Sequence, residues 1–201
     1  MNFDQFNTLI AGTAWPVILV EGTRKLPEED VGRLAAFARW MAETYPQAIF
    51  RTGNAGGTDT AFASGVAQVD PTRIEYVLPY SGHRKTTLES GAAQIDVSKL
   101  TAVAEERVVY HTKQASPEYS GMMARRTKIP QLRAKAKYIL RDTVKVVGSD
   151  EADIAPATVG IFYVNVKDPM KGGTGHTIRV CQQQGVPVVC QTQWMAWGVG
   201  C

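Results

Sequence analysis

The chain has 201 residues and a formal net charge of +3 at pH 7, with 44% hydrophobic and 20% charged residues. This balance is typical of a soluble globular protein, and the length is sufficient for one sizeable hydrophobic core. The small net charge is by itself no argument for nucleic-acid binding, and the apolar runs are too short to span a membrane.

The first half of the chain alternates short apolar runs with helical patterns. Residues 1–15 lack the basic and apolar regions of a signal peptide, and we expect a short peripheral segment there. The order strand–helix–strand–helix–strand, joined by short loops, predicts a Rossmann-like, doubly wound, mainly parallel α/β sheet with helices on both faces. The predicted strands cover residues 17–22, 48–53 and 73–80, and the predicted helices cover residues 27–44 and 60–68, the second capped by Thr58 or Asp59.

The second half of the chain is less regular until its last third. Within residues 87–112, the sequence pattern predicts one short helix near 97–107. Residues 116–148 predict a helical segment that is broken near Ile129–Pro130, because proline does not continue a helix. The last part predicts a βαβ unit, with a strand over 157–165, a glycine turn, a helix ending at Gly185 and a strand over 186–190.

Cysteine and histidine give no sign of a metal site. The three cysteines are odd in number and suit free thiols in a reducing cytoplasm. The three histidines, His83, His111 and His176, lack the spacing of metal ligands. We therefore expect one cytoplasmic domain over residues 1–201, without a membrane contact, a metal or a cofactor.

Three loops at the ends of predicted strands combine glycine with polar or charged residues. Ligands of open parallel sheets bind outside the carboxyl ends of the strands, so these loops should meet at one edge. Glycines before a helix leave backbone N–H groups open to an anion, and Arg24 and Lys25 add positive charge. Asp59 is an acceptor for a ribose hydroxyl or, equally, a helix cap. The candidate ligand-binding residues are Gly22, Thr23, Arg24, Lys25, Gly53, Asn54, Gly56, Gly57, Thr58, Asp59, Gly172, Gly173, Thr174, Gly175 and His176.

Together the three loops resemble the SLOG superfamily of Rossmann-like domains. That group includes the "Lonely Guy" cytokinin-activating phosphoribohydrolases, the putative molybdenum-cofactor carriers and the DNA-processing protein A family. The segments 53–65 and 172–188 are most similar to the DNA-processing and phage-type versions of these loops. The resemblance covers residues 17–192, is weakest over 86–145, and implies a nucleotide-binding domain closest to phage-type or uncharacterised bacterial members. We also expect a homo-oligomer.

The last glycine loop departs from the phosphoribohydrolase pattern Pro-Gly-Gly-x-Gly-Thr-x-x-Glu. Lys171 stands in place of the proline, His176 in place of the threonine, and Arg179 in place of the glutamate. The resemblance implies that this glutamate takes part in N-glycosidic cleavage, and an arginine cannot stabilise a cationic ribosyl centre in the same way. The sequence therefore argues against a standard phosphoribohydrolase and leaves enzymatic activity open, with His176 as the candidate catalytic residue.

The predicted function is the binding of a phosphorylated nucleoside or a nucleotide-derived small molecule. One alternative is an enzyme that cleaves a nucleotide N-glycosidic bond with a rearranged acid/base set. A second alternative is a DNA-processing-type protein that binds single-stranded nucleic acid. The basic segment 125–145 fits a solvated helix face, a wall of the ligand site through Arg126 or Arg133, or a nucleic-acid surface with Tyr138 as a stacking platform.

Overall fold

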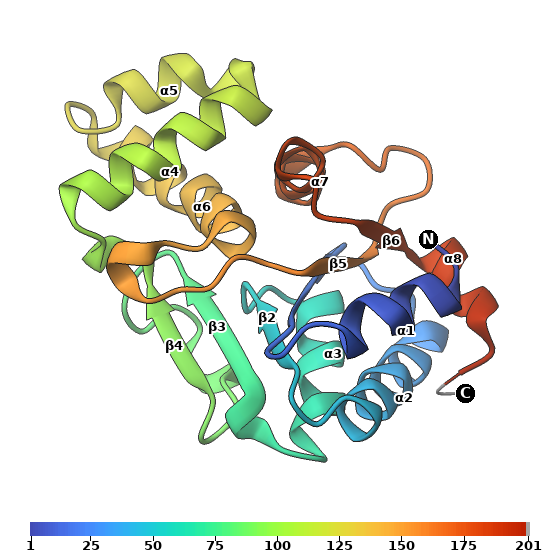
Figure 1. Cartoon of the computed structure of the whole chain (residues 1–201). Helices are drawn as coiled ribbons and strands as arrows, with labels where there is room; N and C mark the ends of the chain where they lie inside the picture. The colour runs from blue at the N-terminus through green and yellow to red at the C-terminus, as the bar shows by residue number, and fades with distance from the viewer. Residues whose placement is uncertain (200–201) are drawn as a thin grey trace.

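The sheet of the computed structural model contains six parallel strands in the order β4-β3-β2-β1-β5-β6, and helices cover both of its faces (Figure 1). The structure describes residues 1–199. This architecture confirms the predicted Rossmann-like α/β fold. The strands are β1 (Val17–Gly22), β2 (Ile49–Thr52), β3 (Ile74–Leu78), β4 (Ala93–Asp96), β5 (Val159–Tyr163) and β6 (Val188–Cys190).

Strand β1 lies in the middle of the sheet and marks the point where the winding changes direction. It pairs with β2, where Ile18 is opposite Phe50, and with β5, where Val20 is opposite Ile161. The chain adds β2, β3 and β4 on one side of β1 and then adds β5 and β6 on the other side. A crevice forms outside the carboxyl ends of the strands at such a switch point, so the loops after β1 and β5 are placed to line a site.

Side-chain alternation along β1 divides the core into two layers. Ile18 and Val20 pack in the layer that contains α1, α2 and α3, whereas Leu19 packs against α7 and the end of α6. Successive strand residues point to opposite faces, so Glu21 lies on the same face as Leu19, toward α6 and α7. The helices are α1 (Phe3–Ala11), α2 (Glu28–Thr44), α3 (Thr58–Ala67), α4 (Ala102–Ala115), α5 (Ser120–Arg125), α6 (Pro130–Val147), α7 (Gly172–Gln184) and α8 (Gln191–Trp194).

The N-terminal segment differs from the prediction. It forms helix α1, whose Phe6 and Ile10 are fully buried. The ring of Phe6 lies 4.9 Å from the ring of Trp197 and 5.9 Å from the ring of Tyr45. The prediction of a peripheral segment is therefore wrong, because two apolar residues four positions apart are enough to anchor one face of a short helix.

The middle of the chain also corrects the prediction at two places. Strand β4 at the sheet edge was not predicted, since its side chains are exposed or half-buried and form no apolar run. The helix expected near 97–107 is α4, which begins after its cap Thr101 and extends to Ala115. The break near Ile129–Pro130 is confirmed, because α6 begins at Pro130. No helix among residues 1–199 is both long and apolar enough to cross a membrane.

Candidate functional site

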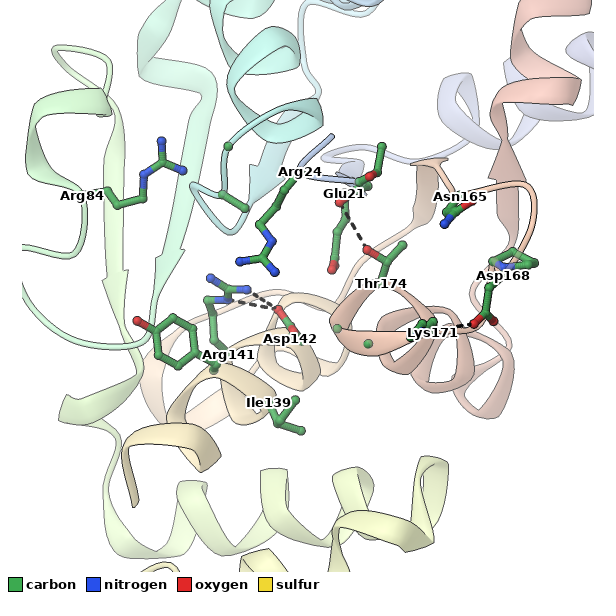
Figure 2. A pocket seen from close by; sticks show the side chains of 18 of the residues that line it. Glu21, Arg24, Arg84, Ile139, Arg141, Asp142, Asn165, Asp168, Lys171 and Thr174 are labelled. Carbon is green, nitrogen blue, oxygen red and sulfur yellow. Dashed lines mark hydrogen bonds and ion pairs between the residues drawn. The ribbon is translucent and has the colours of Figure 1, made fainter. Parts of the chain in front are cut away.

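A cleft of about 570 Å³ opens at the carboxyl edge of the sheet, beside the switch point between β1 and β5 (Figure 2). Its walls come from the loops after β1, β2, β3 and β5, from α6 and from the first turn of α7. Small-molecule sites have volumes of roughly 300 to 1,000 Å³, so this cleft has a suitable size. The predicted residues that line it are Gly22, Thr23, Arg24, Gly56, Gly172, Gly173 and Thr174.

Other predicted residues lie behind the wall of the cleft and hold its loops together. A Cβ atom on Gly57 would lie 2.6 Å from the carbonyl oxygen of Thr23, and Gly57 has a φ of +71°. The Thr58 hydroxyl donates to the same carbonyl at 3.0 Å. The loop after β2 therefore packs directly on the loop after β1. Lys25 is exposed and does not belong to the lining of the cleft.

Asp59 organises the loop after β2 from inside the protein. Its Oδ2 accepts hydrogen bonds from the backbone N–H groups of Gly53 at 3.2 Å and Ala55 at 3.0 Å, and the residue is 1% exposed. The N-cap of α3 is Gly57, without a side-chain hydrogen bond, so the predicted cap by Thr58 or Asp59 is wrong. The Asp59 carboxylate shapes the loop and does not reach the cleft.

Gly175 and Arg179 fasten the loop before α7 to the helix. A Cβ atom on Gly175 would lie 1.9 Å from the carbonyl oxygen of Met170, so only glycine allows this close approach. Arg179 donates to the same carbonyl at 3.1 Å, to the Ser116 hydroxyl at 2.9 Å, and pairs with Glu118 at 2.9 Å. Both residues lie outside the cleft. Arg179, which stands at the expected glutamate position, therefore stabilises the packing of the loop against α7.

His176 lies in the interior and does not line the cleft. Its Nδ1 is 2.7 Å from the Ser116 hydroxyl, and its Nε2 is 2.9 Å from the Thr143 hydroxyl. Burial lowers the pKa of His176 from 6.5 to about 4, so the ring is neutral at pH 7. The ring joins α7 to α6 and to the end of α4. The prediction that His176 is a titratable group facing the ligand is therefore wrong.

The buried ring of His176 predicts a loss of stability in mild acid. Its folded pKa of about 4 lies below the ordinary 6.5, so between these values the unfolded chain binds a proton that the folded chain excludes. Stability should therefore fall by about 3 kcal/mol as the pH drops from 6.5 to 4, at 1.36 kcal/mol per pKa unit. Urea unfolding at several pH values measures this slope. The slope should flatten in His176→Gln and persist in His111→Gln, and an unchanged slope in His176→Gln contradicts the assignment.

Three arginines converge on one half of the cleft. Arg24 is exposed and makes no hydrogen bond or ion pair within the described chain. Arg84 is held by its Nη1, which donates to the carbonyl oxygen of Asn54 at 3.1 Å, while the Asn54 amide donates back to the carbonyl oxygen of Arg84 at 3.2 Å. Arg141 of α6 donates to the carbonyl oxygen of Gly53 at 3.1 Å. These contacts preorganise Arg84 and Arg141, and Arg24 stays available.

The floor of the cleft is a buried charge cluster that the sequence did not predict. Lys145 Nζ contacts Glu21 Oε2 at 2.6 Å and Asp142 Oδ1 at 2.9 Å, and Asp142 also pairs with Arg141 at 2.8 Å. Burial opposes the charge of Asp142, but Arg141 and Lys145 outweigh it and lower its pKa to about 2. Burial raises the pKa of Glu21, and Lys145 offsets part of this effect. The sequence signal for this cluster was Glu21, a charged residue at the end of the apolar run 17–22.

Aromatic rings form the rim of the cleft beside the arginines. The ring of Tyr138 is 5.6 Å from the ring of His83 and 6.4 Å from the ring of Tyr80, in edge-to-face geometry. The Arg141 guanidinium lies 5.6 Å from the centre of the Tyr138 ring. Burial and the charges of Arg141 and Arg84 lower the pKa of His83 from its ordinary value, which disfavours a positive charge on this ring.

The rest of the basic segment 125–145 lies away from the cleft. Arg126 pairs with Glu105 at 2.7 Å and also contacts Glu106. Arg126 and Arg133 line a separate cavity of about 300 Å³, so neither is a wall of the main cleft. The arginine that α6 contributes to the cleft is Arg141. Within residues 1–199, no group of three or more His, Cys, Asp or Glu side chains is placed to hold a metal ion.

Comparisons with known proteins detect similarity at the level of structure only. No protein-family model matches the sequence, and no curated protein matches it. A structure of DNA processing protein A from Helicobacter pylori, from a study of its single-stranded DNA binding mode, shares 12% sequence identity with a TM-score of 0.50. The match covers 91% of this chain and 67% of that one.

DNA processing protein A from Streptococcus pneumoniae is also similar, with 10% identity and a TM-score of 0.48. This chain is covered over 91% of its length but spans only 51% of that protein. At 12% identity, the likeness to the Helicobacter pylori protein shows a common fold and transfers no ligand to this chain. This likeness agrees with the Rossmann-like fold predicted from the sequence, and it shows nothing beyond the fold.

Proposed function

We propose that the cleft binds a phosphorylated nucleoside or a nucleotide-derived small molecule. The observation that carries this proposal is the convergence of Arg24, Arg84 and Arg141 on a cleft at the switch point of the sheet. Guanidinium groups match the oxygens of a phosphate in geometry and charge, and they bind it in a bidentate manner. The cleft has the volume of a small-molecule site and lies where open α/β sheets bind their ligands.

The cationic half of the cleft is the better place for the phosphate. Arg24 has no acidic partner among the described residues, and Arg84 contacts only a backbone oxygen. The N-terminus of α7, where the sequence placed a phosphate cradle, faces two carboxylates instead. A Cβ atom on Gly173 would lie 2.7 Å from Asp142 Oδ2, close enough for the carboxylate to repel a bound anion. The phosphate is therefore assigned to Arg24 and Arg84.

Single-stranded DNA is the second candidate ligand. The fold of DNA processing protein A favours it, and so does the row formed by Arg133, Lys137 and Arg141 along α6. Residues four positions apart lie on one face of a helix, so this row leads from the second cavity toward the cleft. Near this row the exposed aromatic side chains on which bases could stack are Tyr138 and Tyr80. So few stacking residues limit the affinity for single-stranded DNA of any sequence.

Titration calorimetry against nucleoside monophosphates, and fluorescence titration of a labelled oligo-dT at two salt concentrations, distinguish the candidates. We expect saturable binding of a monophosphate and weak oligonucleotide binding that vanishes near physiological salt. Each phosphate contact of a single strand lowers log affinity by roughly 0.7 per unit of log salt, so a strand held by several cations is strongly salt-dependent. Tight oligonucleotide binding at the higher salt, reduced by Arg133→Ala with Lys137→Ala, would replace the first proposal by the second.

A further inference from the structure

The cleft has an acidic half beside its cationic half. Figure 2 shows Arg84, Arg24 and Arg141 on one side, followed by Asp142 and Glu21, and then Thr174. Resting on the proposed function, we infer that Glu21 and Asp142 bind the ribose hydroxyls of the ligand and make the cleft selective for ribonucleotides over deoxyribonucleotides. The sequence suggested Asp59 as the acceptor of a ribose hydroxyl; we assign this role to Glu21 and Asp142 instead.

Each of the two carboxylates uses one oxygen for the buried cluster and leaves the other one open. Lys145 contacts Glu21 Oε2, and both Lys145 and Arg141 contact Asp142 Oδ1. Glu21 Oε1 and Asp142 Oδ2 make no hydrogen bond with any residue from 1 to 199, although both side chains line the cleft. Two acceptor oxygens thus face the ligand space without a partner of their own.

The two open oxygens lie near the same point, which is the position that a Cβ atom of residue 173 would occupy in the first turn of α7. A Cβ atom at this position would lie 2.7 Å from Asp142 Oδ2 and 3.8 Å from Glu21 Oε1. The glycine therefore keeps open the space in front of both carboxylates. Neighbouring acceptors of this kind suit a vicinal diol, whose two hydroxyls donate one hydrogen bond each.

The buried charge cluster determines which chemical groups of a ligand can bind in the acidic half of the cleft. Lys145 and Arg141 keep Asp142 ionised, because they lower its pKa to about 2 against the effect of burial. An ionised carboxylate only accepts hydrogen bonds, so it favours a hydroxyl and repels a phosphate. The arginine half and the carboxylate half are adjacent, as the phosphate and the ribose are in a nucleotide.

The sugar contact predicts a measurable preference. Removing one ribose hydroxyl leaves a partly buried carboxylate oxygen without its donor, and hydrogen bonds to charged groups contribute about 1.5–3 kcal/mol. We therefore expect the best-bound of AMP, GMP, CMP and UMP to bind roughly 10- to 100-fold more tightly than its 2′-deoxy counterpart. In Glu21→Gln, this ratio should fall to roughly 3-fold or less, because an amide offers a weaker acceptor.

Calorimetry of these eight nucleotides with the wild-type chain tests the inference without any variant. Glu75→Gln is the matched control, because Glu75, like Glu21, pairs with a buried cation, here Arg51 at 2.7 Å, but lies outside the cleft. The ratio of ribonucleotide to deoxyribonucleotide affinity should not change in Glu75→Gln. Equal affinity of the wild type for both sugars would overturn the ribose contact and leave the proposed function standing. Binding of no nucleotide would overturn both.

Discussion

Replacing Lys145 by methionine should lower the free energy of unfolding by about 3–5 kcal/mol, the usual cost of removing one member of a buried ion pair. The ammonium group is fully buried and contacts Glu21 at 2.6 Å and Asp142 at 2.9 Å. Burial opposes its charge, but Asp142 and Glu21 outweigh this effect and raise the pKa of Lys145. Without the ammonium, two carboxylates share a buried site, and among residues 1–199 the remaining ion pair there is that of Arg141 with Asp142.

Urea denaturation at pH 7 measures this loss. Lys135→Met is the matched control, since Lys135 is exposed on the same helix and the structure gives it no partner among residues 1–199. The control should change stability by about 0.5 kcal/mol or less, as surface substitutions do. A Lys145→Met variant as stable as this control would show that the charge cluster does not hold the floor of the cleft together.

The fold followed from local patterns that a single sequence displays well. Apolar runs such as 17–22 and 157–165 predict central parallel strands, because both faces of such strands are covered. Gly185 adopts a left-handed conformation with a φ of +68° and ends α7 as expected. Proline at the first helical position and glycine just after the last turn are local signals of a helix end, so the start of α6 and the end of α7 were predictable.

The lining of the cleft depends on contacts between distant residues, and these were not predictable. Glu21 and Lys145 are 124 positions apart, and His176 reaches Thr143 and Ser116 over 33 and 60 positions. Nothing in a local pattern distinguishes a histidine that faces a ligand from one that is buried between two hydroxyls. The same limit applies to Arg141, which the sequence presents as one of several cations in a basic helix.

Glycine was the most ambiguous signal. The same residue type allows an anion to approach a helix N-terminus and allows two backbone segments to touch. Gly173 lines the cleft, whereas Gly57 and Gly175 face the backbone of neighbouring loops. A side chain at Gly57 or Gly175 would therefore disturb loop packing, and loss of binding in such variants would say little about the ligand.

The affinity of Arg24→Gln for nucleoside monophosphates tests the central claim most directly. Arg24 lines the cleft without a partner in the described chain, whereas its neighbour Lys25 is exposed outside the cleft. A lost charge-assisted contact to phosphate should weaken binding roughly 10- to 100-fold, with the unfolding midpoint unchanged. Calorimetry should therefore show this loss of affinity in Arg24→Gln. The affinity of Lys25→Gln should stay within about twofold of that of the wild type. Equal losses in both variants, or none in Arg24→Gln, would contradict a phosphate site in this cleft.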